Sequence, residues 1–453
     1  MPLLGPDDSR RAAELVLARS KTDETEVTVR SEHDRFARYA GDGPTQSADR
    51  ERAVVSIRVR NSVDDGAGWR EARATVGGTS ESELFAALDR ATELVGRAPA
   101  NPDAVPLGGE AAVRASELDA DTAAHAFDEK ARWIDAAVAR SRAEGFDPAG
   151  MAHTTSVACG VYNSAGRAVH GAFQRAAFSL TATGPTGSGL GERIHRRAGD
   201  VDAEAVVERA LAKARLAQEP RAIDPGEMTV VLEPNAVSSL LLFAGYHGFG
   251  AREVVEESSF LCGRVGARAF APDLSIADDA GNDVYPGLPF DGEGTPKERV
   301  VLVDSGVLKG PVTDPVYARK LGLPCTGHAR PQPSSGGPAA QNLVVSPGRA
   351  SSAELLAGVE RGLLITQFHY TNVIDPRELV LTGMTRNGTF LIENGEVTRA
   401  VKNLRFTESL VRALSRVTGI GAQREVAGAL FDGEIVAPAL RIDGFRFTSS
   451  TDF

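Results

Sequence analysis

The sequence predicts an α+β fold in three parts: an N-terminal α/β sandwich-like domain (residues 1–105), a middle α+β domain (106–222) and a strand-rich C-terminal domain (223–453). Two observations lead to this prediction. Short runs in the first part alternate apolar with charged residues, which is typical of a sheet with one face toward water. A length of 453 residues is also sufficient for about three domains.

The N-terminal part begins with a predicted helix at Arg10–Arg19, which has an apolar face. Ser80, followed three residues later by Glu83, is a capping-box pattern that predicts the start of a second helix. The stretch Ala98–Asp103 contains two prolines and is interpreted as a linker. Four strand-like runs lie between the two helices: Glu26–Val29, Arg35–Tyr39, Ala53–Val59 and Glu71–Val76.

The middle part opens with a long predicted helix at Ala120–Glu144. A hairpin follows, with strands at Ser156–Tyr162 and Ala168–Thr183 on either side of a turn that contains Asn and Gly. Another helix is predicted at Val206–Leu216. This pattern is α+β without obvious chemistry.

The C-terminal part starts with a strand at Met228–Leu232 and continues into an apolar, helix-like run from Ser238 to Phe243. Strands and turns dominate after this run, with a loop of small residues at Pro331–Ala340. Two later helices and a closing strand are predicted at Ala353–Gly358, Thr407–Val417 and Glu434–Ile442.

The composition is that of an ordinary globular protein, with 42% hydrophobic and 25% charged residues. No run approaches the ~18 consecutive apolar residues that a membrane-spanning helix needs. The segment Met1–Asp8 lacks the basic start and apolar core of a signal peptide. We therefore expect a cytoplasmic protein without a membrane partner.

The charge balance argues against a nucleic-acid partner. The chain has 50 Lys and Arg against 61 Asp and Glu, a net charge of −11, and shows no basic cluster with interleaved aromatic residues. Cys159, Cys262 and Cys325 are widely spaced and form no CxxC pair, so we expect buried free thiols instead of disulfides or a thiolate zinc site.

The stretch Leu242–His247, which reads Leu-Phe-Ala-Gly-Tyr-His, is followed by two further informative blocks at Gly362–Asn372 and Phe390–Glu396. Together the three blocks resemble the TldD/TldE (PmbA) peptidase family. In the active branch of that family the first block reads His-Glu-x-x-x-His and provides two zinc ligands and a catalytic Glu. The resemblance covers nearly the whole chain in order, with its specific matches after residue 225.

The resemblance implies a vestigial metalloprotease site. Leu242 stands where the family has the first ligand, Phe243 stands where it has the Glu, and only His247 remains. A Leu side chain has no lone pair for zinc, and a Phe cannot accept a proton from water. The family's third ligand is a Cys in the C-terminal region, whereas no Cys follows Cys325 here. We therefore expect no catalytic residue and no metal in this chain.

Other polar residues allow two interpretations. His247 either bonds locally at a helix end or contacts a peptide in the vestigial cleft. The block Tyr370–Pro376 offers hydroxyl, amide and carboxylate groups, which either hold an extended peptide that adds to a sheet edge or cap the turn before Pro376. Besides His247, the residues expected to contact such a peptide are His369, Tyr370, Thr371 and Asn372.

Three further patterns carry little chemistry. The spacing of His328 from His247 and His369 does not predict a shared metal ion. Gly187–Gly191 lacks the flanking strand and helix of a phosphate-binding loop. Cys262 lies in a stretch that the resemblance marks as structural, which disfavours a role as a nucleophile.

The resemblance thus implies a non-catalytic, TldE-like subunit of a cytoplasmic zinc metallopeptidase that degrades or processes unstructured peptides. Its partner is expected to be a TldD-like paralogue with His-Glu-x-x-x-His, in a heterodimer or higher assembly. That paralogue supplies the zinc, and this chain needs no cofactor of its own. The alternatives are a stand-alone homodimeric peptide-binding or scaffolding protein and an independent hydrolase with rebuilt chemistry.

Overall fold

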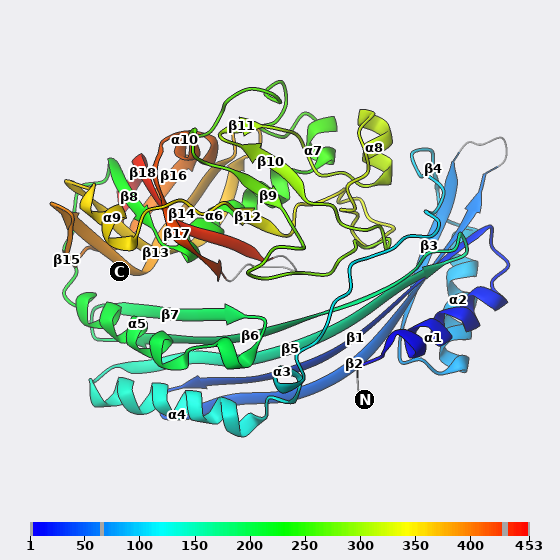
Figure 1. Cartoon of the computed structure of the whole chain (residues 1–453), viewed down its shortest axis with the longest axis horizontal. Helices are drawn as coiled ribbons and strands as arrows, with labels where there is room; N and C mark the ends of the chain where they lie inside the picture. The colour runs from blue at the N-terminus through cyan, green and yellow to red at the C-terminus, as the bar shows by residue number, and fades with distance from the viewer. Residues whose placement is uncertain (1–2, 64–67, 428–433, 452–453) are drawn as a thin grey trace.

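The computed structural model describes residues 3–63, 68–427 and 434–451. Within these residues the chain forms ten α-helices and eighteen strands, which confirms the predicted α+β class. Figure 1 shows two parts: a long, curved sheet from the N-terminal half, and a C-terminal half that lies against the inner face of this sheet.

The N-terminal half is built on one antiparallel sheet with the strand order β4-β3-β2-β1-β5-β6-β7. β1 pairs with β5 continuously from Glu26 to Ala40, so residues 1–105 and 106–222 share this sheet. The strands are β1 (Glu24–Ala40), β2 (Gly43–Ser62), β3 (Trp69–Gly77), β4 (Ala100–Asn101), β5 (Asp147–Asn163), β6 (Ala168–Thr183) and β7 (Ser188–His195).

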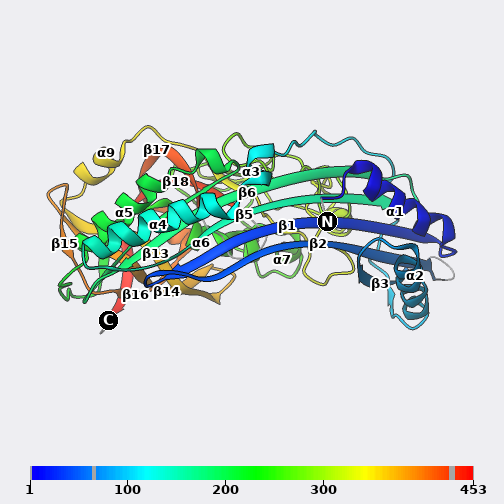
Figure 2. The same ribbon diagram turned by 90° about the horizontal axis from the view of Figure 1, so that it is seen from below.

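Helices cover the outer face of this sheet at both ends (Figure 2). At one end, α1 and α2 pack Val16 and Leu84 against Val27 and Val29 of β1. At the other end, α4 and α5 pack on a second apolar cluster that includes Phe178 of β6. The helices are α1 (Pro6–Arg19), α2 (Glu81–Val95), α3 (Ala120–Ala124), α4 (Phe127–Ala143) and α5 (Ala203–Leu216), with a short 3₁₀ turn at Ala198–Asp200.

The structure differs from the sequence-based expectation in three places in this half. The two strands predicted at Glu26–Val29 and Arg35–Tyr39 are one strand, because the polar residues between them stay paired on both sides. The helix predicted at Ala120–Glu144 is broken at His125, whose carbonyl accepts a 2.8 Å hydrogen bond from the buried Lys130 ammonium. The predicted linker Ala98–Asp103 contains the short strand β4.

The C-terminal half contains an eleven-stranded mixed sheet in which β18 pairs with β8, β12, β16 and β17. The hairpin β13–β14 extends this sheet on the other side of β8. The strands are β8 (Glu227–Leu232), β9 (Ile276–Asp278), β10 (Val300–Asp304), β11 (Val307–Leu308), β12 (Leu343–Val345), β13 (Arg361–Asp375), β14 (Val380–Glu393), β15 (Glu396–Ala400), β16 (Leu404–Ser409), β17 (Val417–Ala427) and β18 (Ile435–Ser450).

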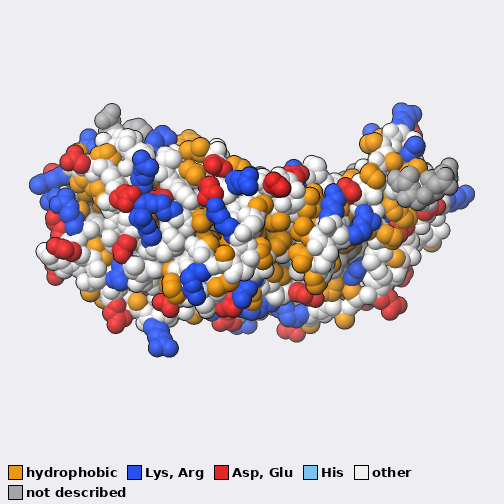
Figure 3. All heavy atoms as spheres, turned by 90° about the horizontal axis from the view of Figure 1, so that it is seen from above, with side chains coloured by type: hydrophobic (Ala, Val, Ile, Leu, Met, Phe, Trp, Pro, Cys, Tyr) orange, Lys and Arg blue, Asp and Glu red, His pale blue; other side chains and the backbone are white. Residues whose placement is uncertain are grey.

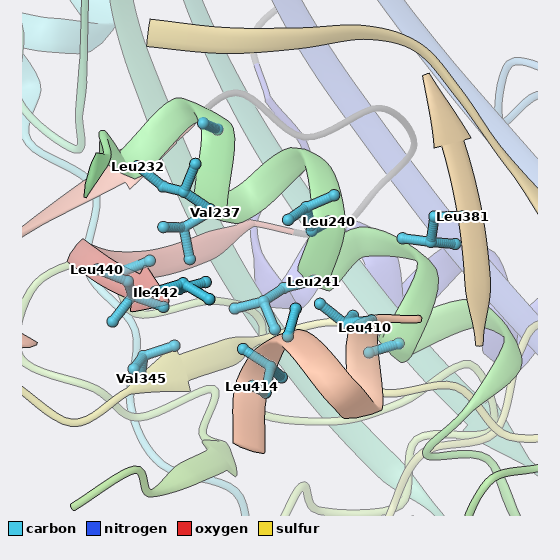
Figure 4. Close-up of a cluster of buried hydrophobic side chains, with 14 of the residues drawn as sticks. Leu232, Val237, Leu240, Leu241, Val345, Leu381, Leu410, Leu414, Leu440 and Ile442 are labelled. Atoms are coloured by element: carbon cyan, nitrogen blue, oxygen red, sulfur yellow. The ribbon is translucent and has the colours of Figure 1, made fainter. Parts of the chain in front are cut away.

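The core of this half surrounds the central helix α6, whose Leu241 faces Leu414 of α10 and whose Val237 faces Leu440 and Ile442 of β18 (Figure 4). The helix predicted at Thr407–Val417 is shorter than expected, because Ser409 ends β16 and its hydroxyl accepts a hydrogen bond from the Arg412 N–H. The helices are α6 (Pro234–His247), α7 (Ala251–Val255), α8 (Pro315–Leu321), α9 (Ser352–Ala357) and α10 (Leu410–Ser415).

Apolar contacts join the two halves. Phe290 from a loop of the C-terminal half packs on Cys159, Val161 and Val169 of the long sheet. On the face seen from above, hydrophobic side chains gather near the middle, while acidic and basic side chains are interspersed around them (Figure 3). In the described part of the chain, no helix has the length and apolar character required to cross a membrane.

Candidate functional site

The candidate site lies at the C-terminal end of α6, where the structure confirms the predicted helix. The helix starts with Pro234 in its first turn, a position where the missing N–H costs nothing. Ser239 has its hydroxyl satisfied by the Asn235 carbonyl at 2.7 Å, so the polar side chain is tolerated inside an apolar helix. The helix ends at Gly248, whose N–H bonds the Ala244 carbonyl at 3.0 Å.

The three motif residues have different environments. Leu242 is 8% exposed and belongs to the central core. Phe243 is half-buried and packs against the same core. His247 lies in the last turn with its side chain exposed. The two positions at which the resemblance implies a first ligand and a base are therefore occupied by packing residues.

A cation already lies beside the remaining histidine. The Arg330 guanidinium lies over the Tyr246 ring, 5.5 Å from its centroid. Partial desolvation, together with the positive charge of Arg330, lowers the pKa of His247. A second cation at His247 meets electrostatic repulsion from Arg330, so this arrangement opposes metal binding.

The space next to Leu242 is small. A cleft of about 10 Å³ lies between Leu242, Tyr246 and the segment around Ala340, which is room for about one water molecule. A Cβ atom at Gly245 would approach the Ala340 carbonyl oxygen to 2.7 Å, so the segment packs directly on the helix backbone. The packing around α6 leaves little volume for a metal ion with its water and ligands.

The second group of predicted site residues lies on β13, away from the α6 terminus in sequence but on a strand that packs against this helix. Tyr370 is 78% exposed and has a φ of 51°. The centroid of its ring lies 4.3 Å from the centroid of the His369 ring. Asn372 is exposed, and its side-chain oxygen accepts a 2.9 Å bond from the Val373 N–H. The Thr371 hydroxyl is buried without a hydrogen-bond partner among the described residues.

The turn before β14 is capped by Asp375 of the block Tyr370–Pro376, as one of the two interpretations of that block expects. The Asp375 carboxylate accepts hydrogen bonds from the N–H groups of Arg377 at 2.9 Å and Glu378 at 3.4 Å. The residues His369 to Asn372 are thus not required for this turn. Their role in peptide contact stays a prediction.

The three histidines considered together have separate surroundings. His328 is buried, and its Nε2 lies 3.0 Å from Oδ1 of the buried Asp278. His369 packs on Tyr370, and His247 lies beside Arg330. Across residues 3–63, 68–427 and 434–451, no group of three or more His, Cys, Asp or Glu side chains is arranged to hold a metal ion.

The cysteines differ in burial. Cys159 is buried, and desolvation raises the pKa of its thiol to about 11. Cys325 is only half-buried, contrary to expectation, but its thiol pKa is also raised to about 11 by desolvation. Cys262 is likewise half-buried, with its sulfur 3.7 Å from the Val254 carbonyl oxygen.

A buried charged cluster at the boundary of the two halves was missed by sequence reasoning. We name it the Arg58 cluster: Glu26, Arg58, Glu71 and Glu293. Arg58 donates to Glu71 at 2.9 Å and to Glu293 of the C-terminal half at 2.7 Å, and lies 3.6 Å from Glu26. Desolvation raises the pKa of Glu26 to about 7, against the opposing effect of Arg58.

A signal for this cluster is present in the sequence. Glu24 and Glu26 stand at alternate positions of one strand, and Arg58 and Arg60 stand at alternate positions of the next. In an antiparallel register these residues face each other, as the pairing of Glu26 with Arg58 and of Glu24 with Arg60 shows. Complementary charges at alternate positions of two adjacent strands predict cross-strand pairs.

Comparisons with known proteins agree with this architecture. Residues 225–449 match the sequence model of the PmbA/TldA metallopeptidase C-terminal domain. The chain is 27% identical over 258 residues to the "Metalloprotease TldD homolog" of Haemophilus influenzae, covering 54% of this chain and 53% of that protein. It is 27% identical over 196 residues to "Metalloprotease PmbA" of Escherichia coli O157:H7, covering 42% and 40%.

The aligned regions thus span about half of each curated relative or less. The fold match is more complete. The crystal structure of TldE from Thermococcus kodakarensis superimposes with a TM-score of 0.84, covering 98% of this chain and 99% of that one, at 20% identity. The C-terminal domain match and the shared fold lead to one conclusion: this chain belongs to the TldD/TldE (PmbA) metallopeptidase family.

Proposed function

We propose that this chain is the non-catalytic, TldE-like subunit of a TldD/TldE-type zinc metallopeptidase. The observation that carries this proposal is the environment of Leu242 and Phe243, which pack in or against the core where the active branch of the family has a ligand and a base. Neither side chain can bind zinc or move a proton.

The residues present do not fit zinc. A catalytic zinc site needs about three protein ligands and an open position for water. Here the α6 terminus offers the exposed His247 with Arg330 beside it, and the adjacent cleft has room for about one water molecule. In this proposal the zinc, the base and the hydrolytic step belong to a paralogue with His-Glu-x-x-x-His.

This chain would contribute walls that hold unstructured peptides. Among the described strands, β13 pairs with β8 only from Gly362 to Ile365, and beyond this point it pairs with β14 alone. The main chain of an extended peptide can form hydrogen bonds with such an edge, and every second side chain of the peptide then contacts residues on the same face of the sheet. Exposed Tyr370 and Ile374 offer apolar contact there, and His369 and Asn372 offer polar contact, whereas the Thr371 hydroxyl is buried and would have to turn outward to take part.

The first test is elemental analysis of zinc in the chain purified without a partner. We expect zinc far below one ion per chain, no cleavage of an unstructured peptide such as β-casein, and cleavage after mixing with a paralogue that carries the complete motif. The paralogue alone is the matched control. Stoichiometric zinc or zinc-dependent cleavage by this chain alone would falsify the proposal.

Sedimentation analysis separates the proposal from the scaffolding alternative. A stable complex with the paralogue supports the subunit role. A homodimer that forms no complex with the paralogue and still binds peptide contradicts that role and supports a stand-alone peptide-binding protein.

A further inference from the structure

A second cleft lies between the two halves, at the end of the long sheet that is remote from α1 and α2. It has a volume of about 600 Å³, within the range of small-molecule sites, and such sites favour boundaries of this kind. Three segments form its walls: the turn between β6 and β7, the connection after α5, and the region from the bulge of β14 to the start of β16. The lining residues are Thr183 to Ser188, Ala217, Glu219, Pro220, Asn387 to Thr389 and Ala400 to Asn403.

The walls are built from close backbone packing. A Cβ atom at Gly187 would come within 2.0 Å of the Ala217 carbonyl oxygen, so the β6–β7 turn fits directly on the end of α5. The β-bulge in β14 contains Asn387 and Gly388, with φ angles of 56° and 128°. This bulge directs Asn387 to the N-terminal half, where its side-chain oxygen accepts a 3.0 Å bond from the Ser188 hydroxyl. Bulges commonly re-aim a side chain near a functional site.

One cation lining this cleft has no carboxylate partner. Lys402 is half-buried, and its backbone N–H is fixed on the Arg221 carbonyl at 3.0 Å. In the part of the chain that the structure describes, its ammonium makes no ion pair. Three other lysines are each paired with a carboxylate: Lys213 with Glu233, Lys309 with Asp304 and Lys320 with Asp103.

Several of the other residues that line the cleft have short polar side chains. The hydroxyl groups of Ser188, Thr186 and Thr389 already donate to side-chain amide oxygens of the protein, so Lys402 is the group of the lining left to pair with an anion. Glu219 is the acidic residue among the lining residues. Glu219 is exposed and has a φ of 53°, a backbone conformation that is uncommon for a residue with a Cβ. Its N–H donates to the Thr186 hydroxyl at 2.8 Å, which fixes the rim of the cleft.

We propose that this cleft binds a small ligand with a carboxylate or phosphate group, which pairs with Lys402. A charge-assisted bond to an ammonium inside a partly desolvated cleft is stronger than a neutral one. This site is independent of the α6 terminus, and the proposal does not depend on the peptidase-subunit role.

The test is calorimetric titration of the full chain with three probes: the tripeptide Ala-Ala-Ala, its C-terminal amide and inorganic phosphate. Lys402→Gln removes the charge, and Thr183→Trp fills the cleft from an exposed strand position without touching the charge. Lys21→Gln is the matched control, because Lys21 is exposed and does not line the cleft. Circular dichroism checks that every variant is folded.

We expect binding of the free-acid tripeptide or of phosphate, with a loss of roughly tenfold or more in both cleft variants and no change in Lys21→Gln. Preference for the tripeptide over phosphate assigns a peptide carboxylate, and the reverse assigns a phosphate ligand. Equal binding of the amide, an equal effect of Lys21→Gln, or no binding of either anion at millimolar concentration overturns the proposal.

Discussion

The α6 terminus and the Arg58 cluster are two buried regions with opposite chemistry. At the α6 terminus, where the family resemblance implies a zinc ligand and a base, the chain places the buried Leu242 and the half-buried Phe243. In the Arg58 cluster, where the two halves meet, it buries a guanidinium among three carboxylates. The junction of the halves therefore buries charged side chains, whereas the end of α6 buries apolar ones.

This difference shows which interactions stabilise the buried side chains in each region. Apolar side chains at α6 gain from leaving water and need no partners. The charges of the Arg58 cluster lose hydration, so each depends on the others, and removal of one member leaves the rest uncompensated. The α6 region should therefore tolerate substitutions according to volume, and the cluster according to charge.

The largest effect is expected from Arg58→Met. This change leaves Glu26, Glu71 and Glu293 buried without their shared cation, so the free energy of unfolding should fall by about 3–5 kcal/mol. Urea denaturation followed by circular dichroism measures it. Arg58→Lys keeps the charge but loses the planar fork, and an intermediate loss is expected. Equal stability of Arg58→Met and the unmodified protein would contradict a coupled cluster.

A somewhat smaller effect is expected from Leu242→Ala. Removing a buried leucine from the central core should lower the free energy of unfolding by about 2–4 kcal/mol through lost burial and a residual cavity. The double change Leu242→His with Phe243→Glu restores the motif's letters, yet zinc should stay substoichiometric because Arg330 remains beside His247. Stoichiometric zinc in this variant would show that the two side chains alone had removed the metal site.

The third prediction concerns pH. Burial raises the pKa of Glu26 from 4.5 to about 7, so between these pH values the native state holds a proton that the unfolded chain has released. The contribution of Glu26 to stability is therefore greatest below about pH 4.5, falls as the pH rises and levels off above about pH 7. Between about pH 4.5 and pH 7 the unmodified protein should lose on the order of 2 kcal/mol of unfolding free energy through Glu26, and Glu26→Gln should not show this loss.

The measurement is the urea midpoint of the unmodified protein and of Glu26→Gln from pH 5 to 8. Asp291 and Glu434 also have raised pKa values and are present in both proteins, so the difference between the two curves reports Glu26 together with its interaction with Asp291. Parallel curves would mean that Glu26 titrates alike in the native and unfolded states.

The smallest effect is expected from Arg52→Met. Arg52 pairs with Glu32 at 3.1 Å on the same two strands as Arg58, but its side chain is 68% exposed. An exposed pair contributes about 0–1 kcal/mol, so the urea midpoint should hardly move. A loss as large as that of Arg58→Met would remove burial as the explanation for the difference between the two arginines.

The sequence predicted the elements with strong local signals. The apolar run at α6 and the hairpin β5–β6 with its Asn-Ser-Ala-Gly turn lie where expected. Prediction from the sequence failed where contacts between residues far apart in the chain determine the extent of a strand or helix. The polar middle of β1 is held in the strand by β2 and β5, and α3 ends because Lys130 bonds the His125 carbonyl. Such pairings depend on residues far along the chain or on a buried ammonium that periodicity does not reveal.

For the candidate site, the apolar run predicted the helix, which is confirmed, while the replacement of a ligand and a base by Leu242 and Phe243 stays a prediction from the resemblance. The motif letters could not reveal Arg330, which reaches Tyr246 from a loop more than eighty residues later. The cleft around Lys402 was also missed, since its walls come from three separate segments and its glycine run was considered only as a phosphate loop. Sites assembled from loops leave little local pattern.

The position of β18 has a consequence for biosynthesis. This strand follows every other strand of the described chain in sequence, yet it pairs with four of them. On the ribosome, β8, β12, β16 and β17 emerge before their common neighbour, with apolar surface and strand edges exposed. The sheet of the C-terminal half is therefore completed only after β18 has left the exit tunnel, and the edges that β18 covers stay open until then.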